Sequence, residues 1–317
     1  MRGYFYARVF LWCIMVQFTK QFRTNRELLS ILENRGVVIS DKVRAEEFLD
    51  YVNYYRLTGY LSSFRPQKSS DDSFLPNTDF ENVRRLYIFD RQLRSLVFEG
   101  VAIIEIYVRA LISSCLGLKG PFVHFDETMF TPYFNKKKKK IWYACHEREI
   151  IRSQEACVRH FQETYDEWPR LPIWVSVELM SFGTISRFYE GLDKPYKEHI
   201  AQNFGQRSKV FQSWLHAVAY VRNVCAHHAR FWNRVLSIRP MIPKNNAAWS
   251  CFSRPSVSKR PFLVLAVINH ILKNIKTNTN MDVQWGIKMQ QLLSDPPPVP
   301  NFEHAMGLPS QWKNFLL

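Results

Sequence analysis

The sequence predicts an all-α protein. Apolar residues recur at spacings of three and four, most clearly between Asp79 and about Cys115, which is the period of a helix with one buried face. No convincing strand alternation occurs, and the long loops that an all-β fold requires are missing. Glycine is scarce, at 11 of 317 residues, which also favours helix.

The first helices are predicted from their capping signals. Thr24 followed by Glu27 forms a capping box that opens a helix ending near Gly36. Ser40 and Asp41 open a second helix that runs to about residue 52. A tyrosine-dense stretch follows at residues 53–64, and residues 67–78 are rich in Ser, Asp, Pro and Asn, which is typical of a loop.

Asp79 begins the longest predicted helix, which is interrupted by one gap in the apolar pattern at Gly100–Val101 and ends between Gly117 and Pro121. Asp90 with Arg94 and Glu105 with Arg109 form i,i+4 pairs on it. The following loop holds the run Lys136, Lys137, Lys138, Lys139 and Lys140. Further helices are expected at about 141–165, from Pro172 with a potential break at Gly183, and at about 195–204, 209–234, 262–275 and 281–293.

We divide the chain into an extension (1–18), an N-terminal helical region (19–78), a helical core (79–240) and a C-terminal helical region (241–317). The run from Val9 to Phe18 is mostly apolar but has no small-residue cleavage site after it and is too short to span a bilayer. We interpret it as a packed or poorly ordered extension or a start-site artefact, with a membrane anchor as the alternative. The cysteines include no CxxC pair, which predicts neither a zinc site nor a disulfide framework and fits a reducing cytoplasm.

Positive charge is concentrated in one part of the chain. The net charge is +15, and the 83 residues from His199 to Met281 contain twelve Lys or Arg and no Asp or Glu. Such a segment indicates an acidic partner, for which nucleic acid is the usual candidate. A solvated basic face is the simpler alternative, but here the charge is interleaved with Trp and Phe. The missing carboxylates argue against a local Mg²⁺ site.

The stretch RNVCAHHARFWNR, from Arg222 to Arg234, carries the most information about function. On a helical wheel of about 100° per residue, one polar stripe holds His216, Asn223, His227, Arg230 and Arg234, if the helix continues that far. The opposite stripe holds Trp214, Val218, Val221, Cys225 and Trp232 and is expected to face the core. His228 falls near the apolar edge, so we expect it to be packed and hydrogen-bonded.

These residue types suit RNA cleavage without a metal, because RNA supplies its own 2′-OH as the nucleophile. An imidazole such as His227 can accept the 2′ proton, and the Arg222 guanidinium can stabilise the charged phosphorane. Asn223 can fix an imidazole tautomer, and Arg222 can curl toward His227 or reach a second subunit. The Arg–His spacing alone carries no weight, since it is common by chance. From the residues alone, a basic helix that binds RNA or an acidic protein without cleavage is the stronger interpretation.

Other residues have two interpretations each. The lysine run could bind phosphates or form a solvated loop. Arg56, in the tyrosine-dense stretch, could contact RNA, although core packing is the simpler role for its aromatic neighbours. Glu178 could pair with an active-site arginine, with a structural salt bridge as the default. His216 could bind RNA or merely line the motif face.

RNVCAHHARFWNR closely resembles the signature of the Abi family of abortive-infection proteins, of the AbiD and AbiF type, within the HEPN superfamily. NYYRLTGYLSSF from Asn53, YIFDRQLRSLVFEGVAIIEIYVRALI from Tyr87, LPIWVSVELMSFGTISRFYEGL from Leu171 and MGLPSQW from Met306 also resemble that family, in the same order. The resemblance covers the chain from about Phe18 to its end.

The resemblance implies a HEPN-like helical bundle with additional N- and C-terminal helices and a role in defence against phage. It implies a metal-independent, cytoplasmic endoribonuclease that needs no cofactor and harms the host when infection is sensed. Arg222 and His227 would be the catalytic pair, with Asn223 as the polar residue after the arginine. Their site would be shared between two copies of the chain, and the substrate would be RNA, with a structured non-coding RNA as one candidate. No stable membrane association is expected, and a non-catalytic RNA- or protein-binding module is the alternative.

Overall fold

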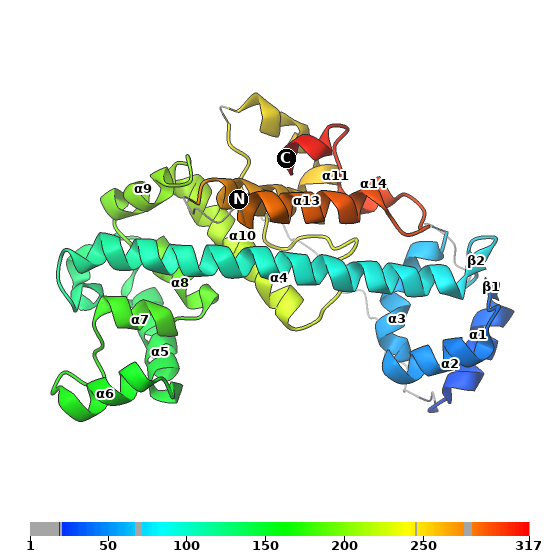
Figure 1. Ribbon diagram of the computed structural model, residues 1–317, viewed down its shortest axis with the longest axis horizontal. Helices are drawn as coiled ribbons and strands as arrows, with labels where there is room; N and C mark the ends of the chain where they lie inside the picture. The colour runs from blue at the N-terminus through cyan, green and yellow to red at the C-terminus, as the bar shows by residue number, and fades with distance from the viewer. Residues whose placement is uncertain (1–18, 20, 67–71, 245, 276–280, 317) are drawn as a thin grey trace, which may run out of the picture. The chain divides into compact units, whose positions relative to one another are not determined.

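The computed structural model describes residues 19, 21–66, 72–244, 246–275 and 281–316, and confirms the predicted all-α fold (Figure 1). The chain forms two compact units. The first contains the described residues up to Thr58 together with Arg65–Phe80, and the second contains Gly59–Phe64 and the described residues from Glu81 onward. Residues 241–317 therefore belong to the same unit as 81–240. The expected extension, residues 1–18, lies outside the described residues.

The first unit begins with the predicted capping box. Glu27 N donates to Thr24 Oγ1 at 3.3 Å, and Thr24 N donates to Glu27 Oε2 at 2.7 Å. Gly36 takes a φ of 93° just after the helix, where a residue without Cβ is favoured. Two parallel two-residue strands, too short to show alternation in the sequence, pair Val37 with Thr78. The elements of this unit are α1 (Asn25–Asn34), β1 (Val37–Val38), α2 (Lys42–Tyr51), most of α3 (Tyr54–Leu61) and β2 (Thr78–Asp79).

The second unit is organised along α4 (Phe80–Gly117), the predicted long helix. The gap in its apolar pattern at Gly100 is where α13 (Met281–Ser294) packs, alongside α4 in Figure 1. Trp285 of α13 donates from Nε1 to Leu96 O at 2.7 Å. A Cβ on Gly100 would lie 2.6 Å from that same Nε1, so glycine permits the close approach.

Helices α5 to α9 differ from the prediction in three places. The lysine run does not lie in a loop: it forms the first turns of α5, whose N-cap Asn135 accepts from Lys138 N at 3.0 Å. The predicted helix at 141–165 is two helices, with a break at Ser153. The later break falls at Ser181, which caps α8 by accepting from Thr184 N at 3.3 Å. The bounds are α5 (Lys136–Arg152), α6 (Ala156–Thr164), α7 (Ile173–Leu179), α8 (Phe182–Gly191) and α9 (Lys194–Gln202).

The core of the second unit lies around α12 (Pro261–Lys273), in which every residue from Pro261 to Asn269 is buried. This helix packs against α10 (Ser208–Ala226) and α13. Short elements complete the unit: η1 (Ser62–Phe64), η2 (Val123–Phe125), η3 (Glu127–Met129), η4 (Ala247–Ser253), α11 (Pro255–Ser258), α14 (Phe302–Met306) and η5 (Trp312–Phe315). None of the described helices combines the length and the apolar character needed to cross a membrane.

Candidate functional site

The motif helix α10 ends at Ala226, so the expectation that it continues to Arg234 is wrong. Ala229 N donates to Val224 O and His228 N donates to Cys225 O, both at 3.0 Å. This pair of bonds is a Schellman motif, which satisfies the last carbonyl groups of the helix and stops it. His228 occupies the position at which glycine is usual and takes a φ of 53°. A side chain in that left-handed conformation costs about 1 kcal/mol.

The segment after the helix is held by Asp90 of α4, which is fully buried. Its carboxylate accepts from Trp232 N at 2.6 Å and from Phe231 N at 3.2 Å. Tyr60 Oη donates to it at 2.6 Å, and Arg94 pairs with it as the i,i+4 spacing predicts. Burial raises the pKa of the Asp90 carboxyl, while the arginine and the hydrogen-bond donors act in the opposite direction.

Arg230 and Arg234, which were expected on the polar stripe of the helix together with His227, also hold this segment. Arg230 Nη1 donates to Gly59 O, and Arg234 donates from Nε to Tyr220 Oη at 3.0 Å and from Nη1 to Arg230 O at 2.8 Å. Because the helix has already ended, neither residue continues the polar face of α10. Both residues are nevertheless partly exposed, so a contact with RNA stays a prediction for them.

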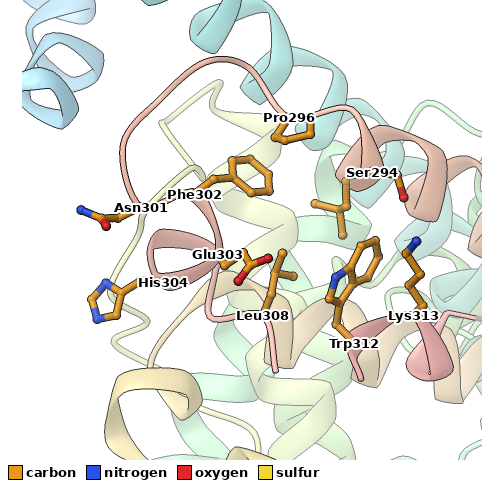
Figure 2. A pocket seen from close by; sticks show the side chains of 10 residues that line it. Ser294, Pro296, Asn301, Phe302, Glu303, His304, Leu308, Trp312 and Lys313 are labelled. Carbon is orange, nitrogen blue, oxygen red and sulfur yellow. The ribbon is translucent and has the colours of Figure 1, made fainter. Parts of the chain in front are cut away.

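Residues beyond 240 support the same segment. Asn233, with a φ of 50°, accepts from Arg260 Nη1 at 2.5 Å. The ring of Trp232 stacks on Phe302 of α14, with centroids 5.2 Å apart. Phe302 also lines a hollow of 640 Å³, around which Figure 2 shows Glu303, Leu308 and Trp312. The motif residues from Arg222 to Arg234 do not line this hollow.

The remaining polar residues of the motif face solvent. His216, Asn223 and His227 are exposed, and α10 buries Trp214, Val218, Val221 and Cys225 on its opposite side as predicted. Burial raises the pKa of the Cys225 thiol to about 12, so this cysteine is not a nucleophile. His228 is exposed rather than packed. Burial therefore does not separate the two histidines. His227 stays the candidate base because its backbone N–H donates to Asn223 O at 3.0 Å, one turn along α10, whereas His228 has left the helical conformation.

Arg222 lies beside α4, in contacts that involve Phe98 and Glu105. Its Nε is 3.7 Å from Glu105 Oε2, and its guanidinium carbon is 5.7 Å from the centroid of the Phe98 ring. Its Nη1 donates to Asn223 Oδ1 at 3.4 Å. The Arg222 side chain is 31% exposed. A phosphate oxygen can therefore approach the guanidinium from solvent.

The predicted pair of Glu105 with Arg109 is confirmed at 2.6 Å, but the contact of Glu105 with Arg222 was not predicted. Glu178, the predicted potential partner for an active-site arginine, is exposed on α7. The one available signal was the position of Glu105 on the apolar side of α4, next to Ile104 and Val108. A carboxylate at a buried position requires a partner.

The other candidate residues lie on other elements than the motif. Arg56 is exposed on α3 and belongs to the first unit. The lysines of α5 are partly neutralised, because Lys138 pairs with Glu190 at 2.7 Å and Lys139 with Glu127 at 3.3 Å. Lys136, Lys137 and Lys140 are exposed at the start of that helix.

This arrangement offers a guanidinium, an amide and two imidazoles near the end of one helix. A guanidinium can bind a phosphate by two hydrogen bonds, and an imidazole can accept a proton and donate one. These are the groups that acid–base cleavage of a phosphodiester requires.

Comparison with protein families matches residues 47–233 to Abi-like protein. No curated protein and no solved structure gave a match. The matched range begins in α2 and ends at Asn233, so it includes α4 and nearly all of the motif. The family suggests a role in abortive infection, a defence against phage. Because the match covers more than half of the chain, the protein belongs to the Abi-like protein family.

Proposed function

We propose that the protein is a metal-independent endoribonuclease of the HEPN type that acts in the cytoplasm in abortive infection. The observation that carries the proposal is that some side chains of the motif hold the fold whereas others are exposed to solvent. Arg230 and Arg234 are partly exposed but their guanidinium groups hold the segment after the helix, whereas Asn223 and His227 are exposed and Arg222 is partly exposed. Polar side chains that solvent can reach, at a helix end this firmly held, are available for chemistry.

In the proposed reaction the 2′-oxygen of one nucleotide attacks the adjacent phosphorus, and the bond to the 5′-oxygen breaks. His227 accepts the 2′ proton, and an imidazolium returns a proton to the departing 5′-oxygen. Arg222 stabilises the charge of the phosphorane with two donors, and Asn223 orients the imidazole or the guanidinium. The products are a 2′,3′-cyclic phosphate and a 5′-hydroxyl.

The test is cleavage of total RNA by the purified protein in EDTA. We expect H227A and R222A each to lower the rate by at least about 100-fold, as expected for the loss of a general base or a charge-stabilising donor. His199→Ala is the matched control, because His199 is exposed on α9 away from the motif. Full activity of both motif variants would refute the proposal.

We propose that two copies share the site, through the α4 stripe formed by Phe98, Ala102 and Ile106. Phe98 and Ile106 are 42% and 64% exposed, and Ala102 between them is also exposed. The stripe is symmetric about Ala102, with a large apolar residue four positions to either side. A two-fold axis at Ala102 therefore sets Phe98 of one copy against Ile106 of the other. Arg222 lies over Phe98, at the edge of this contact.

This dimer predicts a self-crosslink at one position. Ala102→Cys should form an oxidised dimer, because the two copies of residue 102 meet at the axis. Ala110→Cys is the control. Residue 110 lies eight residues, or about 12 Å, from the axis in each copy, so the two thiols of an antiparallel helix pair are about 24 Å apart. Equal crosslinking at both positions, or none at residue 102, would exclude this contact.

Mixing inactive variants tests whether the site is shared. If each site takes Arg222 from one copy and His227 from the other, R222A mixed with H227A forms heterodimers with one intact site. Random exchange then restores about a quarter of the wild-type rate. Sites built within one copy would leave the mixture inactive.

The exposed lysines of α5 favour a second candidate, a module that binds RNA or a partner protein without cleaving RNA. It predicts tight binding and no cleavage products. Replacing Lys136, Lys137 and Lys140 by Gln would then weaken RNA binding and flatten its salt dependence. Intact RNA after prolonged incubation with the wild type would favour this candidate.

A further inference from the structure

Arg222 is connected to the backbone of Met180 through Glu105 and Arg109. Arg109 Nη2 donates to Met180 O at 2.9 Å and to Glu105 Oε1 at 2.6 Å. The other carboxylate oxygen, Oε2, lies 3.7 Å from Arg222 Nε. Met180 lies between α7 and α8, so the carboxylate of Glu105 is fixed by a contact outside its own helix.

Charge and burial distinguish this cluster from a surface ion pair. Glu105 is 7% exposed, and its carboxylate forms ion pairs with two arginines, Arg109 and Arg222. The Nε atoms of Arg109 and Arg222 are buried and have no hydrogen-bond partner among the described residues. The cluster keeps one net positive charge, so it restrains Arg222 without cancelling the attraction for a phosphate.

We infer that Glu105 is the positioning residue for Arg222, an inference that rests on the proposed nuclease function. A long arginine side chain at the end of a helix samples many rotamers unless a partner restrains it. Glu105 attracts the Nε edge of the guanidinium, and the Phe98 ring lies beneath its plane. The remaining donors can then meet a phosphate without losing further rotamer freedom.

A purely structural role makes a different prediction. If Glu105 serves only to join α4 to the α7–α8 connection, its loss should reduce activity in proportion to the unfolded fraction. A positioning role lowers the turnover of fully folded enzyme. Glu105→Gln separates the two, because the amide keeps an acceptor for Arg109 but loses the charge that attracts Arg222.

The experiment measures kcat and KM on RNA for the wild type, E105Q and the control Glu99→Gln. Glu99 lies on the same helix and pairs with Lys288 at 2.9 Å, but its side chain is 47% exposed. Both variants change the net charge equally. We expect E105Q to lower kcat at least tenfold with KM unchanged or lower, because the cluster becomes more positive. We expect E99Q to stay within twofold of the wild type.

A double-mutant cycle shows whether Glu105 acts through Arg222. In single-turnover assays, E105Q should cost nothing further in an R222A background. Additive losses would overturn the inference, as would an unchanged kcat in folded E105Q.

One readout stays valid if the wild type does not cleave RNA. The Arg222 Nε–H resonance, identified by its absence in R222K, should exchange with water slowly in the wild type. It should exchange at least tenfold faster in E105Q and not in E99Q. Unchanged exchange in E105Q overturns the positioning role, whereas missing cleavage with this exchange pattern overturns only the nuclease function.

Discussion

Asp90→Asn tests the account of how the motif segment is held. Asp90 is fully buried and Arg94 is 6% exposed, so the substitution leaves a buried guanidinium without its counter-charge. It also replaces a carboxylate that accepts from Phe231 N, Trp232 N and Tyr60 Oη. Breaking a buried ion pair by removing one partner costs about 3–5 kcal/mol, out of a total stability of about 5–15 kcal/mol.

Urea denaturation followed by circular dichroism measures this cost. The matched control is again E99Q, which removes an exposed pair on the same helix and should cost about 0–1 kcal/mol. A D90N variant within about 1 kcal/mol of the wild type would refute the reasoning.

Three further predictions concern stability. Burial lowers the pKa of His124 from 6.5 to about 3, so between these pH values the folded chain binds fewer protons there than the unfolded chain. As the pH falls from 6 to 4.5, the free energy of unfolding of the wild type should decrease by about 1.4 kcal/mol per pH unit more than that of His124→Gln. Parallel plots of the free energy of unfolding against pH for the two proteins would contradict this. Gly100→Ala should cost about 1–3 kcal/mol, because its Cβ meets Trp285 at 2.6 Å, and an unchanged urea midpoint would count against this packing. His228→Gly should raise the melting temperature by relieving about 1 kcal/mol of left-handed strain, so a fall would show that the imidazole stabilises the fold.

Local features were predictable from the sequence because they depend on neighbouring residues. The capping box at Thr24, the length of α4 and the buried face of α10 follow from spacing and capping rules and are confirmed. Asp90 and Arg94 were also predicted to pair. The pattern did not show that Asp90 binds a segment more than 140 residues away, since such contacts leave no local signal.

The end of α10 was not predictable for a different reason. A Schellman motif usually has glycine at its left-handed position, and here His228 occupies it. Because residues 227–234 contain no glycine or proline, the sequence pattern predicted that the helix continues to Arg234. That error placed Arg230 and Arg234 on a polar stripe, although their side chains hold the fold. The partner of Arg222 was likewise hidden, because Glu105 has a nearer partner on its own helix.

The chemistry of the RNA ends tests the central claim most directly. RNA incubated with the purified protein in EDTA should gain 2′,3′-cyclic phosphate and 5′-hydroxyl ends, and H227A should give neither. Ends carrying a 5′-phosphate, or cyclic phosphates formed equally by H227A, would contradict the assignment of cleavage to Arg222 and His227.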